Sequence, residues 1–278
     1  MGYMVVRGEN KVRIFIDEIA FLIIENPAVS LPGCLLEELI NKKIKVIFCD
    51  NTHSPLSELV PYYGCYDDAR KISTQIKWTD EVKSLVWEEI VADKIRKQAE
   101  HIRELGKEEE SALIMSYIGQ IGNKDSSNRE GFAAKVYFNA LFGMEFTRSE
   151  DNVINAALNY GYSIVLSAFN REIVASGYLT QIGLFHDNMF NHYNLSCDLM
   201  EPFRIIVDKE VASLKLVTFD DKVKHELWDV LNRKIKIKGT VQTVLNAIRI
   251  YVRSVFEAIN ENDVSKLSMY TFIGDADE

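Results

Sequence analysis

Short apolar runs separated by polar residues dominate the first part of the chain. Runs of β-favouring residues cover 3–6, 11–16, 20–24 and 45–50, and residues 34–40 instead repeat apolar side chains at helical spacing. Residues 1–62 therefore predict a small β-rich, β-sandwich-like domain with one short helix, whose N-cap we expect at Ser30. So small a domain buries little apolar surface by itself, so we expect it to form the contact of a homodimer.

Beyond residue 62 the apolar period lengthens from strand spacing to helix spacing. Residues 63–278 predict a larger, all-helical C-terminal domain, which makes the fold class α+β. The expected helices cover 78–106, 108–118, 128–142, 152–176, 198–212, 220–232 and 241–260. Residues 234–239 differ because lysines alternate with apolar residues, which predicts a short strand with one cationic face.

Composition narrows the class of protein. The chain of 278 residues is 47% apolar and 26% charged, which is typical of soluble proteins. It contains no apolar run of about eighteen residues, so we expect no membrane span. The net charge of −9 argues against a protein that coats DNA by its overall charge, although it permits a local basic groove. Four scattered cysteines without a CxxC pair indicate reduced, mostly buried thiols in a cytoplasmic protein.

Groups that bind metals or move protons are densest over residues 181–204. This stretch contains His186, Asp187, His192, Cys197, Asp198 and Glu201. One imidazole and two carboxylates near a helix start suit a hard divalent ion, Mg²⁺ or Mn²⁺. A second interpretation is purely structural. In it Ser196 or Asp198 is an N-cap, Glu201 is a first-turn acid, and His186 is a core histidine.

A second candidate acid lies at the start of the helix expected over 128–142. Ser127 and Glu130 fit the capping-box pattern S-x-x-E, which gives Glu130 a purely structural role. Gly131 follows directly, and glycine inside a helix costs on the order of 1 kcal/mol relative to alanine. We therefore expect a close neighbour that needs the space beside Gly131.

Several segments together resemble one known family. These are NREGFAAKVYF at 128–138, INAALNYGY at 154–162, GLFH at 183–186 and CDLMEPFR at 197–204, with KVIFCD at 45–50 in the β domain. In this order and spacing they resemble the CRISPR-associated adaptation integrases, in particular the type II-A branch. Relatives carry a further strand before the text at 2–8, so the resemblance implies that the first strand of the β domain is missing.

The resemblance also implies roles for individual residues in the C-terminal domain, which it makes catalytic. The metal ligands fall on Glu130, His186 and Glu201, and the cofactor is Mg²⁺ or Mn²⁺. Asp198 is expected to orient a ligand or accept a proton, and Tyr160 is expected near the active centre. Asp187 and His192 match no ligand and are expected at the surface or in contact with the ligand residues. Candidate phosphate contacts along DNA are Arg129, Lys135, Arg204, Lys234, Lys236 and Lys238.

The implied function is spacer acquisition in a prokaryotic cytoplasm. The 3′ ends of short foreign DNA would be joined to a CRISPR repeat by transesterification at the metal ion. The implied partners are double-stranded DNA, a second copy of the chain, a small bridging adaptation protein that completes a heterohexamer, and other type II-A adaptation proteins. Two alternatives stay open: a metal-dependent DNA nuclease without integration, and a non-enzymatic helical DNA-binding scaffold.

Overall fold

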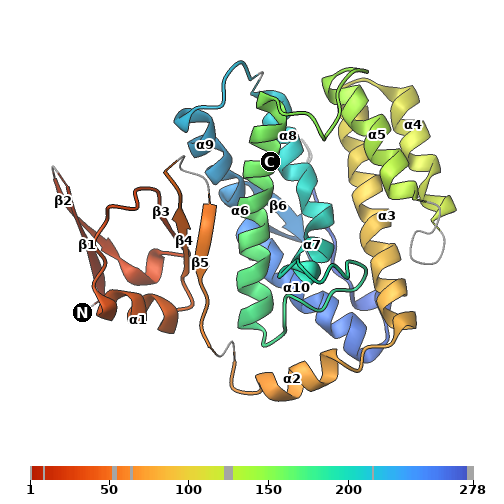
Figure 1. Ribbon diagram of the computed structural model, residues 1–278. Coiled ribbons are helices and arrows are strands. Elements are labelled where there is room, and N and C mark those ends of the chain that lie inside the picture. The colour runs from red at the N-terminus through yellow and green to blue at the C-terminus, as the bar shows by residue number, and fades with distance from the viewer. Residues whose placement is uncertain are drawn as a thin grey trace. The chain divides into compact units, whose positions relative to one another are not determined.

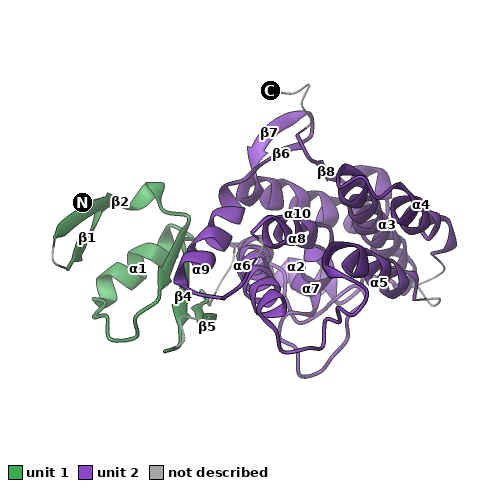
Figure 2. Cartoon of the chain, turned by 90° about the horizontal axis from the view of Figure 1, so that it is seen from above, with its two compact units in different colours: residues 1–64 green, residues 65–278 purple. Residues whose placement is uncertain are grey.

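The chain divides into two compact units. A computed structural model describes residues 2–8, 10–51, 55–62, 65–121, 128–214 and 216–273. Unit 1 comprises Met1–Gly64 and unit 2 comprises Cys65–Glu278 (Figure 2). Each unit is built around its own buried side chains, as described below.

Unit 1 consists of two small sheets and one helix. Strands β1 (Tyr3–Arg7) and β2 (Lys11–Phe15) form an antiparallel pair, followed by the short 3₁₀ helix η1 (Ile16–Glu18). The second sheet has the order β3 (Phe21–Ile24), β4 (Lys45–Cys49) and β5 (Pro55–Leu59). Helix α1 (Gly33–Asn41) makes the crossover between the parallel strands β3 and β4.

One apolar cluster joins the elements of unit 1. Met4 of β1, Leu39 of α1 and Val46 of β4 are buried together in it. The strands predicted from the apolar runs are confirmed, and the expected N-cap is wrong because α1 starts after Pro32, whose ring pre-sets the helical entry. Strand β5 was not predicted, because its sequence PLSEL lacks a β-branched run.

Unit 2 is mostly helical. Its helices are α2 (Asp68–Gln75), α3 (Asp80–Glu104), α4 (Glu108–Ser116), η2 (Ile118–Gln120), α5 (Arg129–Phe142), α6 (Val153–Ala175), α7 (Asn194–Met200), η4 (Glu201–Phe203), α8 (Arg204–Ser213), α9 (Asp221–Trp228), η5 (Asp229–Asn232), α10 (Val244–Glu261) and η6 (Val264–Lys266). Thr79 caps α3 by accepting from the Val82 N–H at 3.4 Å. Helix α2 was not predicted, because DARKISTQ is too polar to show an apolar stripe.

The long helix α3 is the support on which the rest of unit 2 packs. It contacts α4, α5, α8 and α10, and the segment α7–η4–α8 lies between α3 and α6 (Figure 1). Residues on α3 that are buried among these neighbours include polar ones, among them Asp93, Lys94, Lys97, Gln98 and His101. Buried polar groups need partners, so these positions are where a functional site is most readily built.

A three-stranded antiparallel sheet corrects the expectation that the C-terminal domain is all helical. Strands β6 (Lys234–Ile237), β7 (Thr240–Thr243) and β8 (Tyr270–Thr271) have the order β7-β6-β8. Ile235 and Ile237 of β6 are buried, while Lys234 is exposed, so the predicted alternating strand is confirmed. Helix α10 starts later than predicted because residues 240–243 pair with β6.

The structure also answers two expectations drawn from composition. No helix within the described ranges is long and apolar enough to cross a membrane. All four cysteines are free thiols, but Cys34 is exposed whereas Cys49 is buried, so burial is not general.

Candidate active site

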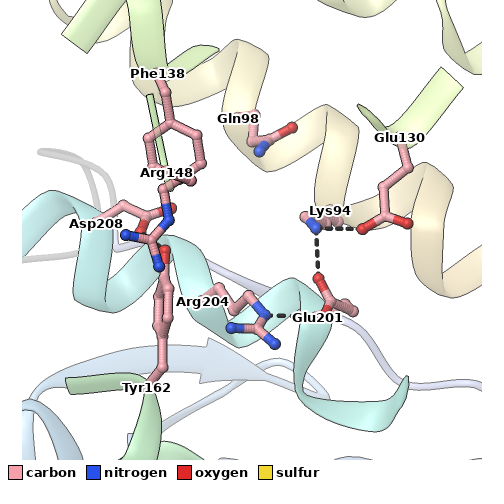
Figure 3. Close-up of a pocket in the computed structure, with 9 residues that line it drawn as sticks. All are labelled: Lys94, Gln98, Glu130, Phe138, Arg148, Tyr162, Glu201, Arg204 and Asp208. Atoms are coloured by element: carbon pink, nitrogen blue, oxygen red, sulfur yellow. Dashed lines mark hydrogen bonds and ion pairs between the residues drawn. The ribbon is translucent and has the colours of Figure 1, made fainter. Parts of the chain in front are cut away.

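Two of the expected ligands meet on a lysine from α3. The ammonium group of Lys94 contacts Glu130 Oε1 at 2.5 Å and also bonds to Glu201 Oε2 (Figure 3). The side chains of Lys94 and Glu201 are 9% and 5% exposed, and that of Glu130 is 24% exposed. Three elements, α3, α5 and η4, therefore bring two carboxylates to one cation in a nearly dry environment.

The charges in this cluster shift the pKa values of Glu201 and Lys94. Burial opposes ionisation of Glu201, but the charges of Arg204 and Lys94 outweigh it and lower the pKa of Glu201. Burial also opposes protonation of Lys94, yet Glu130 and Glu201 raise its pKa. Arg204 Nε donates to Glu201 Oε1 at 2.8 Å and its guanidinium lies 4.6 Å from the centre of the Tyr162 ring. Glu201 is thus held ionised between two cations.

A break in the helical segment aims Glu201 at α3. α7 ends at Met200, a single 3₁₀ turn follows, and α8 begins at Arg204. Pro202 lies in this turn, where a missing N–H and a fixed φ disturb the regular helix. Strand β8 supports the turn from behind, because the Tyr270 hydroxyl donates to the Pro202 carbonyl at 2.9 Å and its ring lies 4.6 Å from that of Phe203.

Asp198 holds the loop that carries His186. Its fully buried carboxylate accepts from the backbone N–H groups of Leu184 at 2.6 Å, Phe185 at 3.1 Å and His186 at 3.1 Å. It also contacts His186 Nδ1 at 2.5 Å. Asp198 lies inside α7, so the interpretation of Asp198 or Ser196 as an N-cap is wrong. The helix begins earlier, at Asn194.

His186 is placed by these bonds and by a buried indole. Trp87 of α3 packs edge-on against the imidazole at 5.9 Å and stacks on Phe185 at 4.7 Å. The hydrogen bond to Asp198 raises the pKa of His186 against the effect of burial, and the charges of Glu201 and Glu130 add to the rise. His186 is 40% exposed, so it is not a core histidine. The second ring nitrogen of His186, Nε2, takes no part in the bond to Asp198.

Gly183 makes the approach of Asp198 to this loop possible. A Cβ atom at residue 183 would lie 2.4 Å from the His186 carbonyl oxygen and 2.7 Å from Asp198 Oδ2. Neither neighbour is the end of a flexible side chain that can turn away without losing the loop contacts. At Gly131 the predicted close neighbour is the Asn128 side chain, 2.6 Å from such a Cβ. Ser127, the other half of the expected capping box, lies outside the described residues.

The oxygen and nitrogen atoms of these side chains suit a divalent ion, but their arrangement differs from the expected one. Two carboxylates already share one cation, and His186, whose Nδ1 is bonded to a carboxylate, has the environment of a metal-binding histidine. No three His, Cys, Asp or Glu side chains in the described segments are grouped closely enough to hold a metal ion. The Lys94 ammonium stands between the acids instead. That Glu130, His186 and Glu201 bind metal stays a prediction.

Comparison with known proteins places the chain. Residues 2–219 match the model of the family described as CRISPR associated protein Cas1. The chain belongs to the Cas1 family. A relative named CRISPR-associated endonuclease Cas1, from Neisseria meningitidis serogroup C (strain 8013), is 30% identical over 259 residues, which is 91% of this chain and 85% of the relative. The family expected from the sequence motifs is thereby confirmed.

More distant Cas1 relatives and solved structures agree. A Cas1 endonuclease from Francisella tularensis subsp. novicida (strain U112) is 24% identical, covering 77% of this chain and 74% of its own. A casposase bound to integration product has a TM-score of 0.76 at 20% identity, covering 92% of this chain and 84% of its own. A Cas1 protein from Thermotoga maritima has a TM-score of 0.69 at 15% identity, with coverage of 93% and 92%. The two structures show a shared fold.

A cavity of about 180 Å³ opens beside the Glu130–Lys94–Glu201 cluster of this Cas1-family chain. It is lined by Lys94, Gln98, Glu130, Phe138, Arg148, Tyr162, Glu201, Arg204 and Asp208 (Figure 3). Tyr160, which the resemblance places near the active centre, is not among the lining residues. Its hydroxyl accepts from Trp228 Nε1 at 2.7 Å, on another side of α6. Tyr162 lines the cavity instead, because residues two apart on a helix point in nearly opposite directions.

The candidate DNA contacts differ in accessibility. Lys135, Lys234 and Lys238 are exposed. Arg129 lies at the start of α5, against the rings of Tyr117 and Phe132. Arg204 donates to Glu201 beside the cavity and its side chain is 25% exposed, so its contact with DNA stays a prediction. Asp187 and His192 are exposed, as predicted.

Sequence reasoning missed Lys94, Gln98 and Asp208. The signal for the first two was present in α3, where Trp87, Val91, Lys94 and Gln98 follow one another at spacings of four, three and four residues. A polar residue that falls on an otherwise apolar stripe is a candidate for a buried side chain that has a polar partner.

Proposed function

We propose that this chain joins the 3′ ends of short DNA duplexes to a CRISPR repeat by metal-dependent transesterification. The observation that carries the proposal is the convergence of two acidic side chains, from α5 and η4, on one cation beside a histidine held by a buried aspartate. Family membership supports the link to CRISPR adaptation. The casposase whose structure contains an integration product shares the fold, which supports DNA joining as the reaction.

The reaction exchanges one phosphodiester for another. A 3′-hydroxyl of the short duplex loses its proton, and its oxygen bonds to a phosphorus atom of the repeat. The bond from that phosphorus to the 3′ oxygen of the adjoining repeat nucleotide breaks, and this oxygen takes up a proton. Glu130, Glu201 and His186 Nε2 would hold Mg²⁺ or Mn²⁺. When bound, the ion would neutralise charge on the phosphate oxygens and favour ionisation of the attacking hydroxyl.

The residues of the chain would orient the ion's ligands and hold the DNA. Asp198 fixes the ring of His186 so that Nε2 keeps one direction. Arg204 keeps Glu201 ionised and fixes its orientation by a charged hydrogen bond. Phosphate contacts along the DNA would come from Arg129, Lys135 and the lysines of β6.

Hydrolysis is the second candidate function, because the relatives are named endonucleases. In hydrolysis a water replaces the 3′-hydroxyl at the same site. The two are separated by incubating the protein with a labelled prespacer-like duplex and a plasmid that carries a repeat. We expect a labelled strand covalently joined to the plasmid in Mn²⁺ or Mg²⁺ and none in EDTA. Shortened fragments without joined product would favour the nuclease, and joining that persists in EDTA would exclude the metal.

We also propose that the chain works as a symmetric dimer bound to a small Cas2-like partner. Joining both strands of a repeat requires two active sites at a fixed separation, and one chain supplies one. In the described part of unit 1, the β1–β2 pair exposes Tyr3, Val5, Val6 and Val12 by 40–53%. One solved structure of the same fold is a Cas6-RT-Cas1–Cas2 complex, with a TM-score of 0.74.

Light scattering should give a dimer mass for the purified chain. Val12→Glu places a charge beside Val6, its exposed partner across the β1–β2 pair, so we expect it to shift the mass towards the monomer. Val217→Glu changes an exposed valine of unit 2 and serves as the matched control. A monomer at micromolar concentration for the unmodified chain would contradict the dimer.

A further inference from the structure

Lys94 occupies the place that the proposed ion requires. Its ammonium bonds to one oxygen of Glu130 and one oxygen of Glu201, and these are the acids expected to bind the ion. An ammonium and a divalent ion between the same two carboxylates would lie a few ångströms apart in a site shielded from water, where like charges repel strongly. The two cations therefore exclude one another.

We propose that Lys94 is a tethered competitor of the divalent ion: it holds Glu130 and Glu201 together until the ion binds, and then moves to Gln98 and Asp208. This inference rests on the proposed function, since it concerns the same site. It assigns Lys94 as a positioning residue that tunes ion affinity rather than as a catalytic residue.

The cavity provides somewhere for the ammonium to go. Gln98 follows Lys94 by one turn of α3, and both line the cavity. Gln98 is 1% exposed, and its Oε1 has no hydrogen-bond partner among the described residues. A buried acceptor without a donor is costly, so a state that supplies the donor is favoured by that amount. The free space beside Lys94 allows the long side chain to turn.

Asp208 is the third acid of the cavity and completes the alternative position. Tyr162 donates to its Oδ1, and the Tyr137 hydroxyl is also hydrogen-bonded to this carboxyl group. Burial raises the pKa of Asp208 to about 6, and the charge of Lys94 already acts in the opposite direction. Figure 3 shows Asp208 and Tyr162 across the cavity from Glu130, with Lys94 and Gln98 on α3. An ammonium turned into the cavity would thus meet a neutral acceptor and an acidic one.

The arrangement has a clear cost and a clear benefit. Without a cation the two carboxylates would repel and separate, so Lys94 preserves the geometry that the ion needs. The same contact lowers the apparent affinity, because the ion binds only the fraction of molecules from which the ammonium has moved away.

Calorimetric titration of the intact chain with Mn²⁺, without DNA, measures this competition directly. We expect Lys94→Met to bind Mn²⁺ roughly 10–100-fold more tightly, because the competing charge is gone and the volume is nearly kept. The matched control is Lys83→Met, which removes a lysine from the same helix about 16 Å away along its axis. Its affinity should equal that of the unmodified chain.

A second variant tests the alternative position without changing any charge. Gln98→Met removes the unpaired acceptor together with the amide NH₂ group, so we expect Mn²⁺ binding roughly 3-fold weaker or more in the presence of Lys94 and no effect in the Lys94→Met background. An equal effect of Gln98→Met in both backgrounds would overturn the proposed movement. If Lys94→Met does not fold, a crystal structure of the unmodified chain with Mn²⁺ decides. An ammonium that has left both carboxylates supports the proposal, and an ammonium retained on them overturns it.

Failure of the inference and failure of the proposed function give different results. Mn²⁺ binding that Glu130→Gln does not weaken would remove the ion site itself, and the inference with it. Binding that depends on Glu130 but is equal or weaker in Lys94→Met would overturn the role of Lys94 alone and leave the proposed function standing.

Discussion

Glu130→Gln is expected to lower the rate of DNA joining by on the order of 10²–10³-fold while leaving the fold intact. Glutamine keeps the shape of the side chain and the start of α5, but it carries no charge to attract a cation. Glu130 is partly exposed, and Lys94 retains Glu201 as a partner, so the loss of stability should be small. The measurement is the initial rate of joined product, with thermal unfolding of the same sample as the test of folding.

The matched control for this variant is Glu145→Gln, which neutralises an exposed acid beyond the end of α5. It should join DNA at the rate of the unmodified chain. His186→Ala should reproduce the loss seen for Glu130→Gln, because both side chains belong to the proposed ion site. Full joining activity in a folded Glu130→Gln protein would rule out its role as a ligand.

The second large effect is expected at Asp198. Asp198→Ala leaves three backbone N–H groups of the His186 loop without their acceptor, so it should lower the free energy of unfolding by about 3–5 kcal/mol. Such a loss corresponds to a fall in Tm of roughly 6–20 °C for a chain of this size. Joining should be lost as well, because His186 is no longer oriented.

Two comparisons make the result for Asp198 specific. Asp198→Asn keeps the shape and one oxygen acceptor, so its Tm should lie between those of the alanine variant and the unmodified chain. Asp187→Ala removes an exposed acid from the same loop and should leave Tm unchanged. A Tm for Asp198→Ala equal to that of Asp187→Ala would contradict the assigned role of the buried carboxylate.

Local sequence patterns predicted most of the helices and strands. The apolar period and Thr79 located α3 within two residues at each end, and the alternation of Lys234 to Ile237 located β6. The start of α7 was misplaced because its N-cap residue, Tyr193, makes no side-chain cap bond, whereas Ser196 and Asp198 are residue types that often cap helices. Sequence periodicity cannot signal a helix whose start is fixed by a packed loop.

The candidate site could be predicted only in part, for a physical reason. Glu130, His186 and Glu201 were found through a resemblance of short segments, but their present partner was not. A lysine in the middle of a helix usually belongs to a solvated face, and only tertiary packing brings Lys94 between two acids 36 and 107 residues away. The pairing of Tyr160 with Trp228 is likewise a property of packing and not of spacing.

The contact between Tyr270 and Pro202 also bears on when the site is completed during synthesis of the chain. Ribosomes release the N-terminal part of a chain first, and Lys94, Glu130 and Glu201 all emerge before Tyr270. Until β8 pairs with β6, the 3₁₀ turn that carries Glu201 lacks its backing hydroxyl and ring. A growing chain therefore holds its two acids before it can set their geometry, and the site matures only when one of its last strands docks.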